Sequence, residues 1–475
     1  MVSGGWLLHA GGPVGQVPAV AADSAFDHFF TGRTMRVDYF HTGKADARIV
    51  TLDRVVDDGP WPGSRTSLLD DTNLGGFRAE IVDLATNAVI YSRGFGAIYG
   101  EWETTPEARA EWRTFHDSLR FPWPKAPVQV VIKRRQSDQT FREIWSVAID
   151  PESRFVNRAP PVPQGTLTTI ADHGAVDRHV DLLFVAEGYT ASQGAEAVAD
   201  ARRLVAALFR EEPYRSREDD FNVRLLHVPS AAAGVHRPQA ASPRRTPVSA
   251  EYNIFDSERY LLTLDNRALR DIASSAPYDA LVLLVNEVQY GGGGVFNSHA
   301  AVAARNEFAD YLFVHEFSHH FAALADEYYT SDVAYETGLT GRPEPWEPNI
   351  TALGHVAALK WRDLVEAATP LPTPWDKEAF DARTAEYQAR RRALRARNAP
   401  EAELSALFRE QQAWEQAFFA RLPFAGKVGA YEGAGYETRG LYRPEQDCVM
   451  FSRNPVGFCR VCRRAIGRVI NLHVT

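Results

Sequence analysis

The sequence predicts an α+β protein in which an N-terminal β-sandwich precedes a larger α/β domain with a mixed sheet. Three observations predict this arrangement. Hairpin signals recur up to about residue 157, a Pro-rich run follows at residues 158–166, and apolar strands then alternate with helices. We therefore expect a leader or flexible N-terminus over residues 1–24, a β-sandwich domain over 25–157, a linker, and a second domain over 167–475.

The first domain has the alternation and turn residues of an all-β fold. Thr86-Asn87 and Ser137-Asp138 each separate two such runs and are typical of β-hairpins. A helix is expected near residues 105–119, and no catalytic constellation is evident, which favours a packing or substrate-docking role. We expect strands at residues 34–40, 49–56, 77–83, 88–93, 128–134 and 140–149.

The second domain alternates strands with helices. Residues 182–186 and 280–285 are continuously apolar, as expected of strands buried on both faces. Thr190-Ala-Ser-Gln193 is a capping box that opens a helix reaching about Arg210. A further strand is expected at residues 221–228 and a further helix at 260–274.

Four glycines at residues 291–294 precede residues 296–303, which we interpret as an edge strand. An extended peptide could add to that edge through main-chain hydrogen bonds. A glycine-rich surface loop is an equally good interpretation. No helix with a Lys-Ser or Lys-Thr pair follows, which argues against a phosphate loop.

Residues 308–324 are typical of an apolar helix, with Asn306 as its expected N-cap, and contain His315-Glu316-Phe317-Ser318-His319. Histidines four residues apart lie on one helical face, so both imidazoles can reach a single metal ion. The glutamate can reach a water beside that ion, an arrangement typical of zinc-dependent peptide hydrolysis. An ordinary buried helix is the alternative, but burying Ser318, His319 and His320 without partners would be costly.

Composition narrows the class of protein. The net charge of −9 and pI of about 5.9 argue against a nucleic-acid surface, and no apolar stretch is long enough to span a membrane. Residues 18–22, Pro-Ala-Val-Ala-Ala, resemble a small-residue cleavage site, although the basic start and apolar core of an export signal are missing. A degraded export signal and a flexible leader both stay open. We expect a secreted or periplasmic protein.

All three cysteines, Cys448, Cys459 and Cys462, lie near the C-terminus, which suggests one local role. A disulfide between Cys448 and one of the others would fit an exported protein. A second, structural metal site is an alternative, because Cys459-x-x-Cys462 has ligand spacing, but the sequence does not identify a fourth ligand. Unpaired buried thiols are the third possibility.

Residues 381–420 are strongly helical and rich in Arg, Ala, Glu and Gln. We interpret them as a helical insertion in the second domain, over about residues 376–420. Their charges predict the solvated face of a helical hairpin and not a binding site.

Several motifs resemble the immunoglobulin A peptidase family of metallopeptidases over residues 180–470. They are His315-Glu316-Phe317-Ser318-His319, Leu324-Ala325-Asp326-Glu327-Tyr328-Tyr329, Trp346-Glu-Pro-Asn349, Lys360-Trp361, Tyr431-Glu-Gly-Ala-Gly-Tyr436, Gly440-Leu-Tyr-Arg-Pro444, Asp447-Cys-Val-Met450 and Phe458-Cys-Arg-Val-Cys462. The resemblance implies an N-terminal β-domain and a metzincin-like catalytic domain. It also implies a methionine turn, with Met450 as the apolar floor beneath the metal.

The chain departs from the metzincin pattern at Ser318 and Ala322, where related sequences usually have glycine. A turn at Ala322 would require positive φ, at a cost of about 1 kcal/mol. The metzincin third ligand would fall at Ala325, whereas the peptidase family's own pattern points to Asp326, with Glu327 as its rival. Asp326 can reach the same ion only if the helix ends near residues 322–324 and the chain turns back.

We therefore predict that His315, His319 and Asp326 bind one catalytic Zn²⁺ and that Glu316 acts as general base. Tyr436 and Tyr442 are the candidates for oxyanion stabilisation. The expected substrate is a protein or peptide, with no nucleic-acid partner. A zinc-containing binding or adhesion protein with a degenerate site and a metallo-amidase acting on cell-wall peptides are the alternative functions. The sequence predicts neither the natural substrate nor the oligomeric state.

Overall fold

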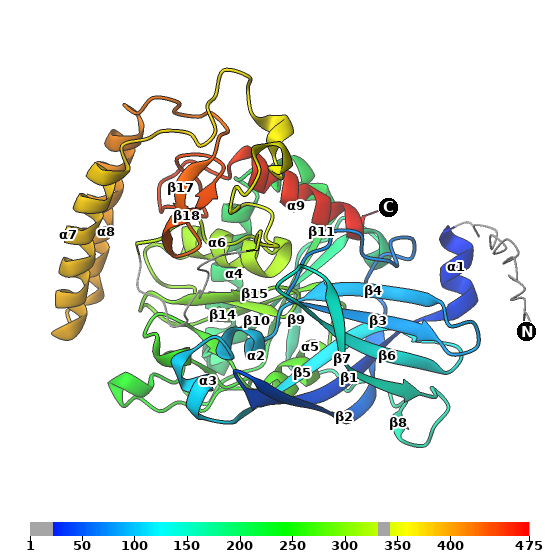
Figure 1. The fold of residues 1–475 in the computed structure, drawn as a ribbon. Coiled ribbons are helices and arrows are strands. Elements are labelled where there is room, and N and C mark those ends of the chain that lie inside the picture. Colours follow the sequence, from blue (N-terminus) through cyan, green and yellow to red (C-terminus); the bar gives the residue numbers. More distant parts are fainter. Residues whose placement is uncertain (1–21, 331–342, 475) are drawn as a thin grey trace, which may run out of the picture.

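The computed structural model describes residues 22–330 and 343–474 of the chain (Figure 1). Most of the predicted leader, residues 1–21, lies outside that range. The first described element is helix α1 (Ala22–Phe29). Within the described residues, no helix combines the length and the apolar character needed to cross a membrane.

Two four-stranded sheets make up the N-terminal part, in the orders β5-β1-β2-β8 and β4-β3-β6-β7. They enclose one apolar core, to which Met35 and Val37 contribute from one sheet and Ile81 and Val130 from the other. This arrangement agrees with the predicted β-domain. The strands are β1 (Phe30–Lys44), β2 (Ala47–Pro60), β3 (Phe77–Asp83), β4 (Val89–Phe95), β5 (Arg113–Pro124), β6 (Val128–Arg135), β7 (Phe141–Ile149) and β8 (Val156–Asn157).

The helix predicted at residues 105–119 is wrong. Thr105 does cap a helix, but α3 (Pro106–Ala110) ends after five residues, and the chain then enters β5. In β5 the apolar side chains of Phe115, Leu119, Phe121 and Trp123 are buried at a spacing of two or four residues. This two-residue period is the pattern of a strand, and pairing with β1 over most of its length outweighs the local helix preference.

A six-stranded sheet of order β15-β16-β14-β10-β11-β9 forms the centre of the second part. The four inner strands run parallel and both edge strands antiparallel, so the predicted mixed sheet is present. The strands are β9 (Thr166–Ala171), β10 (Val180–Glu187), β11 (Phe221–His227), β14 (Ala280–Val285), β15 (Gly292–Val295) and β16 (His299–Ala303). The domain limits and the linker at residues 158–166 stay predictions.

Helices cover both faces of this sheet. Leu182 and Phe184 of β10 share a core with α4 (Gly194–Leu208) and α6 (Ala309–Ala322). Leu183 and Val185 point the other way, toward α5 (Asn266–Ala273). The capping box at Thr190 is present and precedes α4 as predicted. The helix predicted from residue 260 begins later, because the short strands β12 (Ala250–Glu251) and β13 (Leu262–Thr263) pair first and Asp265 caps α5.

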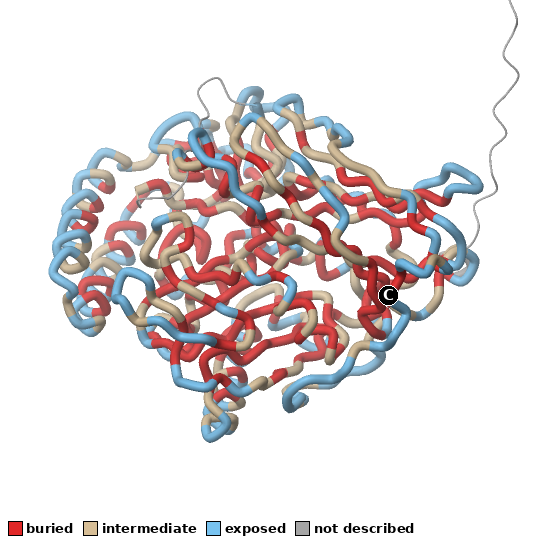
Figure 2. Tube along the Cα trace, turned by 90° about the horizontal axis from the view of Figure 1, so that it is seen from below, coloured by how far each residue is buried: buried red, intermediate tan, exposed pale blue. Residues whose placement is uncertain are grey.

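The predicted insertion is an antiparallel pair, α7 (Lys377–Ala396) and α8 (Glu401–Phe419), which stands at one side of the molecule (Figure 1). Exposed and buried residues alternate along these helices, whereas buried residues dominate the centre of the molecule (Figure 2). A hairpin of β17 (Tyr431–Ala434) and β18 (Glu437–Arg443) and the C-terminal helix α9 (Arg460–His473) complete the fold.

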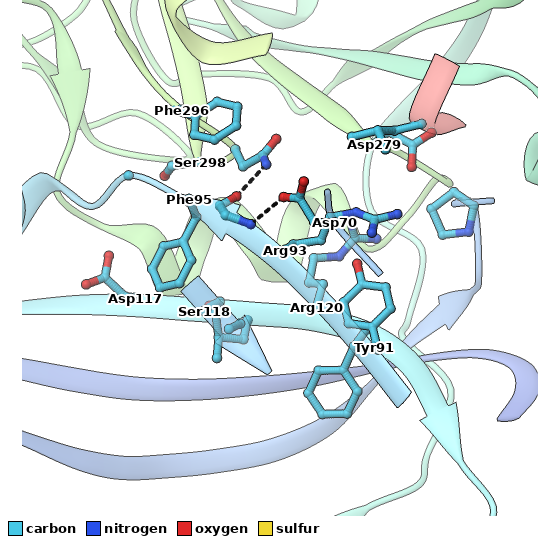
Figure 3. Close-up of a pocket in the computed structure, with 18 of the residues that line it drawn as sticks. Asp70, Tyr91, Arg93, Phe95, Asp117, Ser118, Arg120, Asp279, Phe296 and Ser298 are labelled. Atoms are coloured by element: carbon cyan, nitrogen blue, oxygen red, sulfur yellow. Dashed lines mark hydrogen bonds between the residues drawn. The ribbon is translucent and has the colours of Figure 1, made fainter. Parts of the chain in front are cut away.

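The two parts are in direct contact. The Gly96 N–H donates to the Phe296 carbonyl at 2.8 Å, and the Asn297 side chain donates to the Gly94 carbonyl at 2.7 Å. The cavity beside this contact is lined from both parts, by Asp70 and Arg93 on one side and by Asp279 and Ser298 on the other (Figure 3). Helix α2 (Ile98–Trp102), which follows Gly96, packs into the core beneath the central sheet. The β-domain therefore packs directly against the second part and shares a hydrophobic core with it.

Candidate functional site

Helix α6 presents His315 and His319 on the same face, four residues apart. Their Nε2 atoms lie 3.1 Å from each other. The Nδ1 atom of His315 faces the Val449 carbonyl at 3.1 Å, and that of His319 faces the Leu324 carbonyl at 2.5 Å. Carbonyl oxygens only accept, so each Nδ1 carries a proton and each Nε2 is the atom that would bind an ion, which would displace any proton held there.

The helix ends where the third side chain requires it to end. Ala323 follows α6 with φ 54°, and its N–H donates to the His319 carbonyl at 3.2 Å, which turns the chain back. The positive φ predicted for Ala322 is found one residue later. A left-handed alanine costs about 1 kcal/mol, which the surrounding structure offsets.

This turn brings Asp326 to the two histidines. Its Oδ1 lies 2.9 Å from His315 Nε2 and 3.2 Å from His319 Nε2. Tetrahedral N and O ligands at about 2.0–2.2 Å from an ion lie roughly 3.3 Å apart, so these spacings fit one metal ion. Asp326 Oδ1 is buried, and among the described residues its polar partners are the two imidazole nitrogens, as expected of an atom that shares an ion with them.

Charge and burial oppose each other at this cluster. Burial acts to raise the pKa of Asp326, but His319 and His315 outweigh it and hold that pKa well below its ordinary value. Burial likewise acts to lower the pKa of His319, and Asp326 raises it to about 9. A carboxylate kept ionised among imidazoles has the donor chemistry of a cation site.

Glu316 lies half-buried on the same helix, beside the glycine run. Burial raises its pKa above the ordinary value for a glutamate, while His315 and His319 act to lower it. A Cβ atom on Gly292 would lie 2.9 Å from Glu316 Cγ, and one on Gly294 would lie still closer to the Glu316 carbonyl oxygen. The glycines therefore let a strand lie directly against the helix at this residue.

The edge strand predicted at residues 296–303 is wrong. The glycines themselves form the edge strand β15, and β16 lies inside the sheet. The outer side of β15 is already bonded near both ends, because Gly292 exchanges hydrogen bonds with the main chain of Arg259 and Leu261 and the Phe296 carbonyl accepts from Gly96. The sequence suggested that a bound peptide could approach this edge, whereas in the structure helix α6 lies against the glycines.

Two polar side chains with no role assigned from the sequence hold the loop that carries Asp326. The buried Asn349 side chain bonds both the N–H and the carbonyl of Ala325, each at 2.8 Å. Lys360 donates to the carbonyls of Pro345, Glu347 and Ile350, which fixes the segment that presents Asn349. These contacts give a structural role to Asn349 and Lys360, one residue from each of two motifs noted in the sequence.

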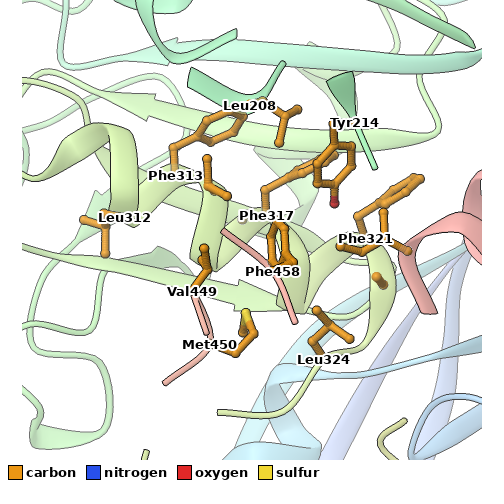
Figure 4. Close-up of a cluster of buried hydrophobic side chains, with 14 of the residues drawn as sticks. Leu208, Tyr214, Leu312, Phe313, Phe317, Phe321, Leu324, Val449, Met450 and Phe458 are labelled. Carbon is orange, nitrogen blue, oxygen red and sulfur yellow. The ribbon is translucent and has the colours of Figure 1, made fainter. Parts of the chain in front are cut away.

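Met450 lies in a tight turn against α6, fully buried among apolar side chains (Figure 4). The turn is closed by the Phe451 and Ser452 N–H groups, which donate to the Cys448 carbonyl at 2.8 and 2.9 Å. The Met450 carbonyl also accepts the Glu327 N–H at 2.8 Å. Met450 is therefore buried as an apolar floor would be, but that role and the metzincin likeness stay predictions.

Of the two tyrosines considered for the oxyanion, the structure brings only Tyr436 to the cluster. Its hydroxyl donates to Asp326 Oδ2 and lies 3.3 Å from the Tyr328 hydroxyl. Tyr442 lies in β18, where its main chain exchanges hydrogen bonds with Thr351. Arg259, not singled out from the sequence, faces the Tyr328 hydroxyl with two guanidinium nitrogens at 3.4 Å each.

Comparison with protein families agrees with this geometry. Residues 168–470 match the IgA Peptidase M64 family, and residues 25–146 match the Peptidase M64 N-terminus. The chain belongs to the IgA Peptidase M64 family. A search of curated proteins found no significant match. Membership supports a peptidase of the metal-dependent kind that acts on proteins or peptides, and it places the candidate cluster inside the matched peptidase region.

A cavity adjoins the cluster in this M64 peptidase, and the helical insertion forms one wall of it. Three arginines line it, Arg259, Arg391 and Arg453, together with His315, Glu316 and residues of α7 and α8. The predicted solvated face is therefore only one side of the insertion, and whether its inner face binds anything stays a prediction. Its outer face is solvated, as the exposed Arg390–Glu410 pair shows, but its inner face borders the candidate site.

The β-domain also reaches the site. Glu101 of α2 accepts a hydrogen bond from the Tyr260 hydroxyl, and burial raises the pKa of Glu101 to about 7. The charges of His319, Glu316 and Asp326 also act on that pKa, which places Glu101 in their electrostatic neighbourhood. No sequence signal marks this residue, because its proximity depends on how the two parts pack.

Proposed function

We propose that this M64 family member is a zinc-dependent endopeptidase in which His315, His319 and Asp326 hold the ion. The observation that carries the proposal is the convergence of two Nε2 atoms and one carboxylate oxygen within 3.2 Å of one another. Two imidazoles and a carboxylate, with room for a further ligand, are typical of catalytic zinc.

When bound, zinc would supply Lewis acidity and make a water acidic enough to attack at neutral pH. Glu316 would accept a proton from the attacking water at its carboxylate and would pass that proton to the leaving amine. Its raised pKa suits both halves of this role. Val449 and Leu324 fix the imidazole tautomers through their carbonyls. The donor that we propose for the developing oxyanion is Tyr436, whose hydroxyl here donates to Asp326 Oδ2.

The cavity beside Glu316 supports a preference for acidic side chains. Burial lowers the pKa of Arg391 to about 9, and the charges of Arg259 and Arg453, which line the same cavity, add to that effect. Burial raises the pKa of Glu415 in the same cavity to about 7, so this carboxyl balances the arginines only weakly. An aspartate or glutamate side chain of the substrate is the natural partner for such a pocket.

Two other functions use the same residues. A binding or adhesion protein with a degenerate site is less consistent with the intact, fully oriented cluster. A metallo-amidase acting on cell-wall peptides would need the same ion and base, and differs only in substrate. We also propose the domain limits given above. We further propose export to the periplasm or the medium, which residues 18–22 support.

The test is digestion of a denatured protein by the purified chain, with and without a chelator, followed by addition of Zn²⁺. We expect digestion to stop on chelation and to return with zinc. Full metal content without digestion of any denatured protein would favour the binding function. Cleavage of cell-wall peptides alone would favour the amidase.

A further inference from the structure

A second cluster of potential ligands lies behind the candidate catalytic site. It consists of Glu327, Cys448, Cys459 and Cys462, which come from three separate segments. All four side chains are buried, and one ligand atom of each lies within 4.8 Å of those of the others. The cysteines are free, so the disulfide considered from the sequence is absent from the structure.

The spacings within the cluster fit a single ion. Cys462 Sγ lies 3.9 Å from Cys448 Sγ and 3.2 Å from Glu327 Oε1, and Cys459 Sγ lies 3.9 Å from the same carboxylate oxygen. Sulfur ligands at about 2.3 Å from a tetrahedral zinc lie roughly 3.8 Å apart. The two sulfurs are well beyond the roughly 2.05 Å of a disulfide bond.

The surrounding main chain favours thiolates. The Cys459 N–H donates to Cys448 Sγ at 3.2 Å, and the Cys462 N–H donates to Cys459 Sγ at 3.4 Å. Cys459 and Cys462 also stand at the start of the 14-residue helix α9, where the helix dipole stabilises negative charge. Backbone donors thus offset part of the charge that three thiolates would carry.

The Glu327 side chain gives evidence for a bound ion that does not depend on the cysteines. It is fully buried, and its Oε2 atom has no hydrogen-bond partner among the described residues. Its Oε1 accepts from the Asn349 side chain at 3.1 Å, which aims the carboxylate toward the sulfurs. Neutral thiols would offer Oε1 only weak S–H donors and would leave Oε2 buried without a partner among the described residues, at a free-energy cost.

We propose that Glu327, Cys448, Cys459 and Cys462 form a closed, structural zinc site distinct from the catalytic one. Four protein ligands, three of them thiolates, leave no open position and select a soft, tetrahedral ion. Glu327 is the fourth ligand that the sequence could not identify. It therefore has a role of its own and does not compete with Asp326 for the catalytic ion.

The structural site would anchor the two chain segments that position the proposed catalytic ligands. Glu327 follows Asp326 directly, and Cys448 precedes Val449, whose carbonyl holds His315. One ion bound to both segments would fix the distance between them. The proposal stands on these residues alone and does not require the protein to be a peptidase.

The test is the zinc content of the full chain, by elemental analysis after exhaustive dialysis. We expect two ions per chain in the wild type. The double variant His315→Ala/His319→Ala should keep one, and Cys462→Ser should lose one. Glu327→Gln, which keeps the hydrogen bond with Asn349, should also lower the content toward one ion. One zinc in the wild type and none in the double variant would overturn the proposal.

Cobalt substitution tests the site without a cysteine variant, which could fail to fold. In the double histidine variant, Co²⁺ should give the thiolate-to-metal charge-transfer absorption of a sulfur-rich tetrahedral site. A mercurial reagent should release the ion as it titrates three thiols. Absence of that absorption, or a disulfide found by mass spectrometry of the native chain, would contradict the site. If the wild type holds only the ion bound by Glu327 and the cysteines, the structural site stands and the proposed catalytic ion is refuted.

Discussion

Asp326 and Glu327 are adjacent residues whose side chains face different clusters. Main-chain hydrogen bonds fix this divergence, since the Asp326 carbonyl accepts from Gly435 at 2.9 Å and the Glu327 N–H donates to Met450 at 2.8 Å. The partners are more than 100 residues away in sequence. The sequence spacing therefore allowed either carboxylate to be the third ligand. Only the three-dimensional fold shows that the two side chains face different clusters.

Glu316 is the residue whose loss should separate metal binding from chemistry. Glu316→Gln keeps the size of the side chain and removes its basicity, so we expect the zinc to stay and peptide hydrolysis to fall by about 10²–10⁴-fold. Turnover of a fluorogenic peptide and elemental analysis of the same sample test this. Glu307→Gln, at the surface pair with Arg409, is the matched control. Wild-type turnover in the Glu316→Gln variant would remove the assigned base.

Asp326→Asn should weaken the binding of the ion that we propose His315 and His319 hold. The carboxylate oxygen nearest both imidazoles becomes a weak neutral ligand, so we expect the loss in affinity to exceed the roughly 10–100-fold typical of outer-shell changes. Competition with a chromophoric chelator measures that affinity. Unchanged affinity would show that another group is the third ligand.

Tyr436→Phe tests the hydroxyl that donates to Asp326. If this hydroxyl also serves the oxyanion, kcat should fall by about 10²–10³-fold while KM and zinc content stay close to wild type. Steady-state kinetics with parallel metal analysis distinguish the roles. Lost zinc with normal turnover per bound ion would make Tyr436 a support of Asp326 only.

At the scale of elements, the helices and strands with a strong pattern could be predicted, and the contacts between them could not. The capping box before α4 and the buried strand β14 follow from local residues. The end of α6 does not, because Ala323 adopts positive φ without a glycine to mark it. Likewise β5 looks helical until its pairing with β1 is known.

The inner face of α7 and α8 gives the element-scale prediction. Arg391→Glu reverses one charge in the cavity beside Glu316, so we expect kcat/KM for peptides with acidic side chains to fall about tenfold or more, and that for basic peptides to rise. A peptide library read by mass spectrometry measures both. Arg392→Glu, one residue along on the exposed side, is the control and should leave the preference intact. Equal loss for all peptides would refute an acid-selective pocket.

At the scale of the whole molecule, the two parts depend on each other. Glu101 reaches the candidate site from the β-domain, and the main chain at Gly96 bonds to Phe296 at the end of β15. A packing or docking role for the β-domain could be predicted from its lack of catalytic residues. Its position against the central six-stranded sheet could not be predicted, because no local pattern encodes which surfaces of two parts of a chain meet.

Buried titratable groups in both parts make stability depend on pH in opposing directions. Burial lowers the pKa of His41 and of His299 to about 3, whereas burial raises the pKa of Asp117 to about 7. Between about pH 6.5 and 3 the unfolded chain binds protons on these histidines that the folded chain does not, so their contribution to stability is lost as pH falls. Asp117 acts oppositely, because between about pH 4 and 7 the folded chain holds the extra proton.

Single substitutions should therefore change the pH slope with opposite signs. His299→Leu removes a buried nitrogen that lacks a partner among the described residues, so its stability relative to wild type should grow as pH falls from 6.5 toward 5, by at most about 1.4 kcal/mol per pH unit. Asp117→Asn replaces a half-buried carboxyl whose buried Oδ2 likewise has no partner in the described part of the chain, and its stability relative to wild type should grow as pH rises from about 5 to 7. Urea unfolding at several pH values measures both differences. Parallel slopes in the two variants would contradict the assignment of these groups, because only opposite proton uptake on folding can make the slopes diverge.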